Sequence, residues 1–409
     1  MGLNTEAERY PRYRWVILGI AWITLLCLYW SWFLIPSLAS RLSLDLGLSH
    51  LQYTLIFTAP VMMGIWCAIT AGAAADRFGI RRVVAIAAFL GGVGGLARAF
   101  APNFEVMFIM MCLVGMAAYG SMSNLPKLVA IWFPPKQAGF AAGIYTMSIG
   151  LGLTLGLFTA PLFPDWQTAF TVVGIITLVA AFLWALLARN APKGVEINMP
   201  PMISGIKRGL RSRNILLVCV VYFLYMGMFT AFSGNFPEAL ELIHHISPAT
   251  AGAITAMLTG AAILGNLLVP ALSDRLGLRK PFIYGAAIII PISLFFAWQL
   301  APSVATWVLV FVGGLGVGTL PPIILTLPLE LPEIGQEHVG GATGLMISAH
   351  SIGGVIIPLL VISPIVAAGT AQAYSAGFLV MMLLLAAAII PTLFLMETGR
   401  RGKADPSPH

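Results

Sequence analysis

Long apolar runs constrain the fold of this chain more than any motif does. A helix that crosses the hydrocarbon core of a bilayer needs about 20 apolar residues. The sequence contains twelve runs of about this length, at residues 15–38, 51–75, 83–101, 106–132, 139–162, 167–188, 215–236, 249–273, 281–300, 303–327, 339–363 and 372–396. Backbone N–H and C=O groups in lipid must be paired internally, which favours helices for such runs. We therefore expect an all-α membrane protein with twelve transmembrane helices.

The charged residues support this interpretation and orient the chain. Only 9% of the 409 residues are charged, whereas soluble domains carry about a quarter. Twenty of the 22 Lys and Arg residues fall in the two terminal segments, in alternate loops or, for Lys127, near the same end of a run, the side that is cytoplasmic by the positive-inside rule. We expect a protein of the cytoplasmic (inner) membrane with both termini in the cytoplasm. The net charge of +7 then reflects topology and anionic lipid, so no nucleic-acid partner is expected.

Two similar segments follow the second and the eighth run. Residues 72–82 read GAAADRFGIRR and residues 270–280 read PALSDRLGLRK, so Asp76 and Asp274 are 198 positions apart (274 − 76). An offset repeat of this kind indicates a duplicated six-helix unit, as in many carriers. We expect an N-terminal bundle over 1–188, a cytoplasmic linker over 189–214 and a C-terminal bundle over 215–409. A basic helix on the membrane surface is expected from 203 to 213.

Each repeated segment has the composition of a tight turn that can act as a conformational latch. Its glycine permits a left-handed backbone, and its aspartate can pair with an arginine or cap a helix N-terminus. Such a contact can hold one conformation and release in another. The alternative is that these residues only keep a basic turn on the inner side. The candidate latch residues are Gly72, Asp76, Arg77, Gly79, Arg81, Arg82, Asp274, Arg275, Gly277 and Arg279.

The twelve runs, the central linker and the two turns together resemble the major facilitator superfamily over the whole chain. The resemblance implies two pseudo-symmetric six-helix bundles around a central cavity, lined mainly by helices one, four, seven and ten. Residues 124–136, NLPKLVAIWFPPK, are also similar to the region between helices four and five of nitrate/nitrite, cyanate and organic-anion carriers. Nitrate carriers use an arginine in helix two and another in helix eight. Neither run has one here, so the resemblance favours other small anions over nitrate.

Ionisable side chains in the membrane are functional candidates because their burial is costly. No Asp or Glu lies deep in a run, and Glu238 is expected at a helix end or in a loop, so a buried carboxylate proton carrier is not expected. His350, near the middle of the eleventh run, can bind an anion, accept a proton, or stay neutral in a structural hydrogen bond. Lys127 shares a helix face with Tyr119 and Ser123. It can offer a positive charge to a solute or reach the inner interface.

Aromatic and small polar side chains complete the set of candidates. Aromatic stripes on the first and seventh runs fit a cavity wall, lipid contact or helix packing equally well. Prolines 321, 322 and 328 of the tenth run are expected to kink it and free carbonyl groups, and Arg98 is expected to anchor at the outer surface. The candidate substrate-binding residues are Tyr29, Trp32, Phe33, Tyr119, Ser123, Asn124, Lys127, Tyr145, Tyr222, Tyr225, Asn266, Thr319, His350 and Ser351.

Together these features predict a secondary active or facilitative transporter that works by alternating access. The shortage of deep acids favours a small organic or inorganic anion such as a monocarboxylate. Two alternatives stay open: a carrier or exporter of an amphipathic or quaternary-ammonium solute held by aromatic rings, and a membrane sensor that has lost transport. The sequence has no catalytic group, phosphate loop or metal cluster, so no enzyme activity, cofactor or metal is expected. A proton or another ion is a candidate for coupling, and we expect a monomer in the bilayer with a small molecule as its partner.

Overall fold

The computed structural model describes residues 11–191, 202–335 and 338–399, and every regular element in these ranges is a helix. The chain divides into two compact units, residues 1–48 with 55–199 and residues 49–54 with 200–409. Residues 192–201, in the middle of the expected linker, and both chain termini lie outside the described residues.

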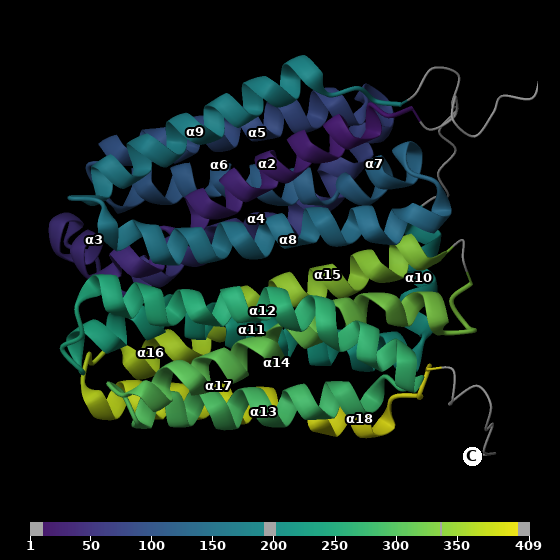
Figure 1. The fold of residues 1–409 in the computed structure, drawn as a ribbon. Coiled ribbons are helices and arrows are strands. Elements are labelled where there is room, and N and C mark those ends of the chain that lie inside the picture. Colours follow the sequence, from purple (N-terminus) through teal and green to yellow (C-terminus); the bar gives the residue numbers. More distant parts are fainter. Residues whose placement is uncertain (1–10, 192–201, 336–337, 400–409) are drawn as a thin grey trace, which may run out of the picture. The chain divides into compact units, whose positions relative to one another are not determined.

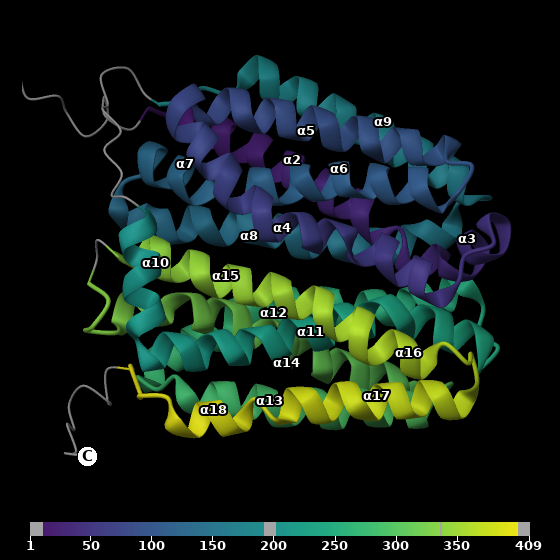
Figure 2. The same ribbon diagram turned by 180° about the vertical axis from the view of Figure 1, so that it is seen from behind.

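The first unit consists of long helices that run side by side, drawn from purple to blue in Figure 1 and seen from behind in Figure 2. Its elements are α2 (Arg14–Phe33), η1 (Pro36–Leu38), α3 (Ala39–Leu46), α4 (His50–Phe78), α5 (Ile80–Ala97), η2 (Arg98–Phe100), α6 (Phe104–Met122), α7 (Leu125–Trp132), α8 (Pro135–Thr159), η3 (Ala160–Leu162) and α9 (Trp166–Leu187). The first turn of α4 belongs to the second unit.

The second unit repeats this plan with helices drawn from teal to yellow (Figure 1). Its elements are α10 (Met202–Arg211), α11 (Arg213–Leu242), α12 (Pro248–Leu276), α13 (Lys280–Gln299), α14 (Val304–Glu330), α15 (Val339–Ile356), η5 (Ile357–Ile362), α16 (Ser363–Val366), α17 (Ala371–Ala386) and α18 (Ile389–Phe394). The segment η5 is a turn of π-helix.

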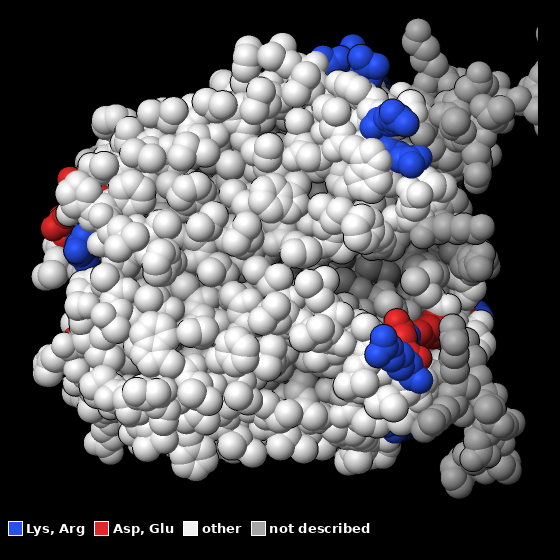
Figure 3. Space-filling view, in the orientation of Figure 1, with Lys and Arg blue, Asp and Glu red and all other residues white. Residues whose placement is uncertain are grey.

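Eleven helical segments among the described residues are long and apolar enough to cross a membrane. The twelfth is α4, which is bent between Cys67 and Thr70. In Figure 3 the charged side chains in view lie at the ends of the helices of each unit, and the helix flanks in view show none. An apolar flank is what lipid requires of a spanning helix. The predicted all-α fold with about twelve transmembrane helices is confirmed.

The seventh span is longer than the sequence predicted. Its expected end, at residue 236, comes just before Pro237, which lacks the N–H that a helix interior uses. In the structure α11 continues through Pro237 to Leu242. Glu238 therefore lies inside a spanning helix and is 7% exposed. Glu238 lies near the end of its helix, as expected, but the expectation that no buried carboxylate is present is wrong.

The linker ends in a basic helix, as predicted, although α10 spans Met202–Arg211. It packs on α15 of its own unit, where a side chain added at Gly205 would lie 2.5 Å from the His338 carbonyl oxygen. Glu333 fixes the turn that follows, because its carboxylate accepts hydrogen bonds of 2.9 Å from both Ser212 and Asn214. These contacts attach α10 to the second unit.

Candidate functional site

Aromatic side chains from α2, α4 and α6 form one cluster in the first unit. The ring of Trp32 lies 5.7 Å from Tyr29 and 6.2 Å from Tyr119, measured between centroids. Its indole N–H donates to the carbonyl of Phe57 at 3.1 Å, and the Phe57 ring packs edge-on to Phe33 at 5.6 Å. All five side chains are at most 5% exposed. The sequence did not predict Phe57, because no regular spacing links α4 to the stripe on α2.

The polar candidates of the first unit lie where α6 passes into α7. Asn124 is fully buried, and its Nδ2 donates to the carbonyl of Gly120 at 2.8 Å. Its Oδ1 has no hydrogen-bond partner among the described residues. The hydroxyl of Ser123 donates to the same Gly120 carbonyl. Tyr145, on α8, makes no side-chain hydrogen bond or ring contact with these residues in the described part of the chain.

Lys127 belongs to the first latch turn in the structure. Its Nζ lies 2.6 Å from Asp76 Oδ1 and 3.1 Å from the carbonyl oxygen of Gly72. The Asp76 side chain is 55% exposed and that of Lys127 is 24% exposed. The aspartate therefore pairs with a lysine from α7, where the sequence suggested an arginine or a helix end. An exposed pair of this kind stabilises weakly, by about 1 kcal/mol or less.

The rest of the first turn is attached to the end of α9. Gly79 has a φ of +86°, a conformation that L side chains rarely adopt. The backbone N–H of Arg81 donates to Asn190 Oδ1 at 2.8 Å, and the Arg81 guanidinium donates to the carbonyl of Ala185. The turn thus joins α4 and α5 to α9. Arg77 packs over the ring of Phe78, and Arg82 is exposed.

The second latch turn has a different arrangement of charge. Gly277 ends α12 in the left-handed conformation with φ +67°. Arg279 then contacts Asp274 at 2.7 Å and Glu330, at the end of α14, at 2.5 Å. The hydrogen bond to Glu330 raises the pKa of Arg279 above its ordinary value, although burial opposes it, so the guanidinium stays charged. Arg275 is exposed.

The two turns therefore use opposite partners. Asp76 meets a cation, Lys127 of α7, whereas Arg279 meets an acid, Glu330, at the end of α14. Glu330 was not among the predicted site residues. The sequence offered one indication, because Glu330 lies two residues before Pro332, and Pro332 follows Pro134 at the same offset of 198 as the two turns.

In the second unit, His350 of α15 packs against the aromatic face of α11. Its ring centroid lies 4.3 Å from that of Tyr222 and 6.4 Å from that of Tyr225. Its Nδ1 is buried and has no hydrogen-bond partner among the described residues. A buried polar atom without a partner is rare in folded proteins. This nitrogen is therefore available to form a hydrogen bond with a ligand.

A proline on α14 helps to hold this aromatic face in place. Pro321 has no N–H, so it leaves the carbonyl of Val317, four residues earlier, without its helical donor. The hydroxyl of Tyr225 donates to this carbonyl at 3.1 Å. The structure therefore shows one of the freed carbonyls that the prolines predicted. The helix itself is continuous from Val304 to Glu330.

The remaining candidates of this unit are not joined to His350 by the described contacts. Thr319 is 5% exposed, and its hydroxyl donates to the carbonyl of Leu315 on its own helix. Asn266 lies part-buried on α12. Ser351 is fully buried, and its hydroxyl has no partner among the described residues.

Arg98 is not the surface anchor that its position near the end of α5 suggested. It is fully buried and donates to the hydroxyl and the carbonyl of Ser31 at 2.6 and 2.8 Å. Its guanidinium lies 4.3 Å from the ring centroid of Phe170. Cation–π contact and hydrogen bonds to α2 compensate in part for lost hydration. Arg98 therefore joins α2, α5 and α9 inside the first unit.

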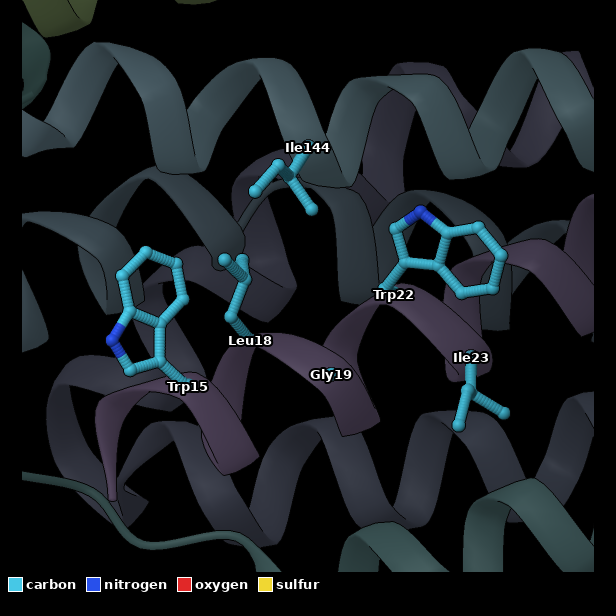
Figure 4. A pocket seen from close by; sticks show the side chains of 6 residues that line it. All are labelled: Trp15, Leu18, Gly19, Trp22, Ile23 and Ile144. Atoms are coloured by element: carbon cyan, nitrogen blue, oxygen red, sulfur yellow. The ribbon is translucent and has the colours of Figure 1, made fainter. Parts of the chain in front are cut away.

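An open groove of about 360 Å³ on the first unit has no polar lining group beyond two indole nitrogens. Figure 4 shows its lining side chains, which come from α2 and α8: Trp15, Leu18, Gly19, Trp22, Ile23 and Ile144. None of the candidate binding residues lines it. An apolar groove on a spanning helix offers nothing for recognising a charged solute.

Comparison with known proteins places this architecture among transporters. The family model of the Major Facilitator Superfamily matches residues 21–358 and 218–409. The probable nitrate/nitrite transporter NarK2 of Mycobacterium tuberculosis is 27% identical over 341 residues, covering 81% of this chain and 84% of that protein. The probable sulfoacetate transporter SauU of Cupriavidus necator is 23% identical over 376 residues, covering 85% and 86%.

A solved structure supports the same fold. The bacterial homologue of the human lysosomal transporter Spinster, in an inward-facing and occupied conformation, superposes with a TM-score of 0.77. The superposition covers 97% of this chain and 99% of that chain at 14% identity. Identity this low supports a shared fold and carries no information about the solute.

Proposed function

Because the chain belongs to the Major Facilitator Superfamily and is a multi-pass membrane transporter, not an enzyme, we propose that it carries a small anion by alternating access. A small organic anion such as a monocarboxylate is the favoured solute. The relatives named above as transporters of nitrate/nitrite and of sulfoacetate support the anion class. In this proposal the carrier works as a monomer in the cytoplasmic membrane with both termini in the cytoplasm, the arrangement that the distribution of Lys and Arg favours.

The observation that carries the proposal is the unpartnered Nδ1 of His350 beside Tyr222 and Tyr225. A neutral imidazole can donate an N–H hydrogen bond to a carboxylate. The contacts of this cluster within the described residues include no Asp or Glu side chain, so they place no negative charge there that would repel an anion. Tyr225 is held by its bond to Val317, which keeps the aromatic wall in a fixed position.

In the same proposal the latch turns set the conformational equilibrium. The half-exposed Lys127–Asp76 pair opens readily because solvent screens it. The Asp274–Arg279–Glu330 network, in which Arg279 is 9% exposed, breaks less easily than the Lys127–Asp76 pair. The ionic contact of the first turn would then break more easily than that of the second when the carrier changes conformation.

Counterflow in proteoliposomes tests the solute class. Vesicles loaded with unlabelled pyruvate receive labelled pyruvate, and nitrate, sulfoacetate and choline are added separately as competitors. We expect exchange that anions inhibit and choline does not. His350→Ala should lose this exchange because the ligand loses its buried hydrogen-bonding partner. Ser348→Ala, on the same helix, should retain it because that hydroxyl only donates to the Gly344 carbonyl.

Three results would contradict the proposal in different ways. Competition by choline with no effect of anions would favour a quaternary-ammonium carrier that binds by cation–π contact. No flux of any tested solute through correctly inserted protein would favour a sensor. Full exchange by His350→Ala would remove His350 from the binding site.

A further inference from the structure

Glu238 is the one acidic side chain that is buried in the described part of the chain. It lies on α11 one turn before the helix ends at Leu242. Its Oε2 accepts a hydrogen bond of 3.2 Å from the hydroxyl of Tyr374 on α17. The three ion pairs among the described residues involve other side chains. The carboxyl group therefore has a hydrogen-bond donor and no cationic partner there.

The tyrosine that donates to this carboxyl belongs to a cluster of aromatic rings. The ring of Tyr374 lies 6.3 Å from that of Phe378 and 6.4 Å from that of Trp298, and Phe378 packs edge-on to Phe236 of α11. A carboxylate moved from water into such surroundings without a cation is strongly destabilised. Binding a proton removes the charge and with it this cost.

The titratable neighbours do not supply the missing cation. Tyr374 faces Glu238 from α17, Glu241 approaches it from the next turn of α11, and Tyr53 does so from the first turn of α4, which belongs to this unit. Farther along, His50 bonds to Asn235 and His244 packs on Trp298. Two of the three near groups are neutral phenols, and the third is a second acid.

The helix beside Glu238 lacks one backbone hydrogen bond, which makes it easier to bend at this point. Pro237 leaves the carbonyl of Ser233 without its helical N–H donor, and the buried hydroxyl of Ser233 also has no hydrogen-bond partner in the described residues. Bends in spanning helices concentrate at such prolines. The same helix carries Tyr222 and Tyr225 of the candidate binding site, so a bend here moves the end of a binding helix.

We propose that Glu238 is a proton-binding site that couples solute movement to a proton, with Tyr374 as its positioning residue. An oxygen of Glu238 forms an O–H bond with a proton from one aqueous phase, and the same bond breaks when the proton is released to the other phase. One proton carried with one monovalent anion moves no net charge. The coupling rests on the proposed function, whereas proton binding itself does not.

Infrared difference spectroscopy of the full-length protein in lipid nanodiscs tests proton binding without any solute. Raising the pH should abolish a carbonyl-stretch band of a protonated carboxyl group. The band should be absent in Glu238→Gln and present in Glu241→Gln, the matched control on the same helix. Tyr374→Phe should keep the band and move its disappearance to higher pH by about one unit, since a hydrogen bond to the charged form is lost. A merely structural role for Tyr374 would not move this value.

Proteoliposomes with an imposed pH gradient test the coupling, with labelled pyruvate as the probe. Wild type and Glu241→Gln should accumulate pyruvate when the gradient is imposed, and Glu238→Gln should lose that accumulation. Gradient-driven accumulation by Glu238→Gln, or an unchanged carboxyl band in that variant, would overturn the proposal. If wild type moves no pyruvate at all, the proposed function fails instead, and the infrared band alone decides whether Glu238 binds the proton.

Discussion

The hydrogen bond from Tyr225 to Val317 makes a quantitative prediction about how α11 and α14 are held together. Tyr225→Phe keeps the ring, which stacks 6.0 Å from Tyr222, and removes only the hydroxyl. The Val317 carbonyl then has neither Tyr225 nor a helical donor, because residue 321 is proline. Interhelical hydrogen bonds in membranes contribute about 1 kcal/mol, and an unsatisfied buried acceptor costs about 1–3 kcal/mol. We expect Tyr225→Phe to lower the free energy of unfolding by about 1–2 kcal/mol.

Replacing the proline should make this hydroxyl dispensable. Pro321→Ala restores a backbone N–H four residues after Val317, so the carbonyl regains a helical donor. In that background Tyr225→Phe should cost close to nothing, which gives a coupling energy of about 1–2 kcal/mol in a double-mutant cycle. Pro322→Ala is the matched control, because it restores a helical donor for the Gly318 carbonyl and leaves the Val317 carbonyl without one.

Unfolding of the purified variants in mixed detergent micelles measures each free energy. The hydrogen-bond explanation requires coupling with Pro321→Ala and additivity with Pro322→Ala. Additivity within about 0.3–0.5 kcal/mol for both prolines would refute the reasoning that the proline creates the acceptor. Equal coupling with both would refute the assignment to Val317.

Two further predictions concern packing and pH. An alanine at Gly318 would overlap the carbonyl oxygen of Ala262, so Gly318→Ala should destabilise the α12–α14 contact by about 1–3 kcal/mol and lower the thermal unfolding temperature. Gly285→Ala, which meets nothing within 4 Å, should not; equal losses in the two variants would contradict the packing argument. Burial raises the pKa of Glu333, but hydrogen bonds from Asn214 and Ser212 and the charge of Arg208 bring it below its ordinary 4.5. A lowered pKa means that the ionised form stabilises the docking of α10 above pH 4.5, and that this stabilisation is lost as pH falls through the lowered pKa. Spin-label distances between α10 and α15 should increase on acidification in wild type and not in Glu333→Gln.

The spans were predictable because lipid imposes one requirement on every residue of a spanning segment. A run such as 167–188 can satisfy its backbone only as a helix, and the observed helix is Trp166–Leu187. The end of α11 was mispredicted because Pro237 ordinarily marks a boundary. In the structure neighbouring helices cover the turn after Pro237, and Glu238 is buried with its carboxyl hydrogen-bonded to Tyr374.

The candidate site was predictable only as a set of residue types. The sequence identified His350 as an unusual ionisable group and Pro321 as a source of a free carbonyl. It could not pair Tyr225 with Val317, because the two are 92 positions apart and no periodicity relates separate helices. Arg98 illustrates the same limit. A basic residue near a helix end is usually at an interface, and only the packing of Ser31 and Phe170 around it makes burial tolerable.

The sequence by itself thus determined the membrane fold and the positions of the two similar turns. These follow from local rules: hydropathy over about 20 residues and turn chemistry over four or five. The tertiary structure alone decided which charges pair, so that Lys127 meets Asp76 while Arg279 meets Glu330. It also decided that Glu238 is buried beside Tyr374. Burial and pairing depend on side chains from distant helices, and the energy of a charge in a membrane depends almost entirely on those neighbours.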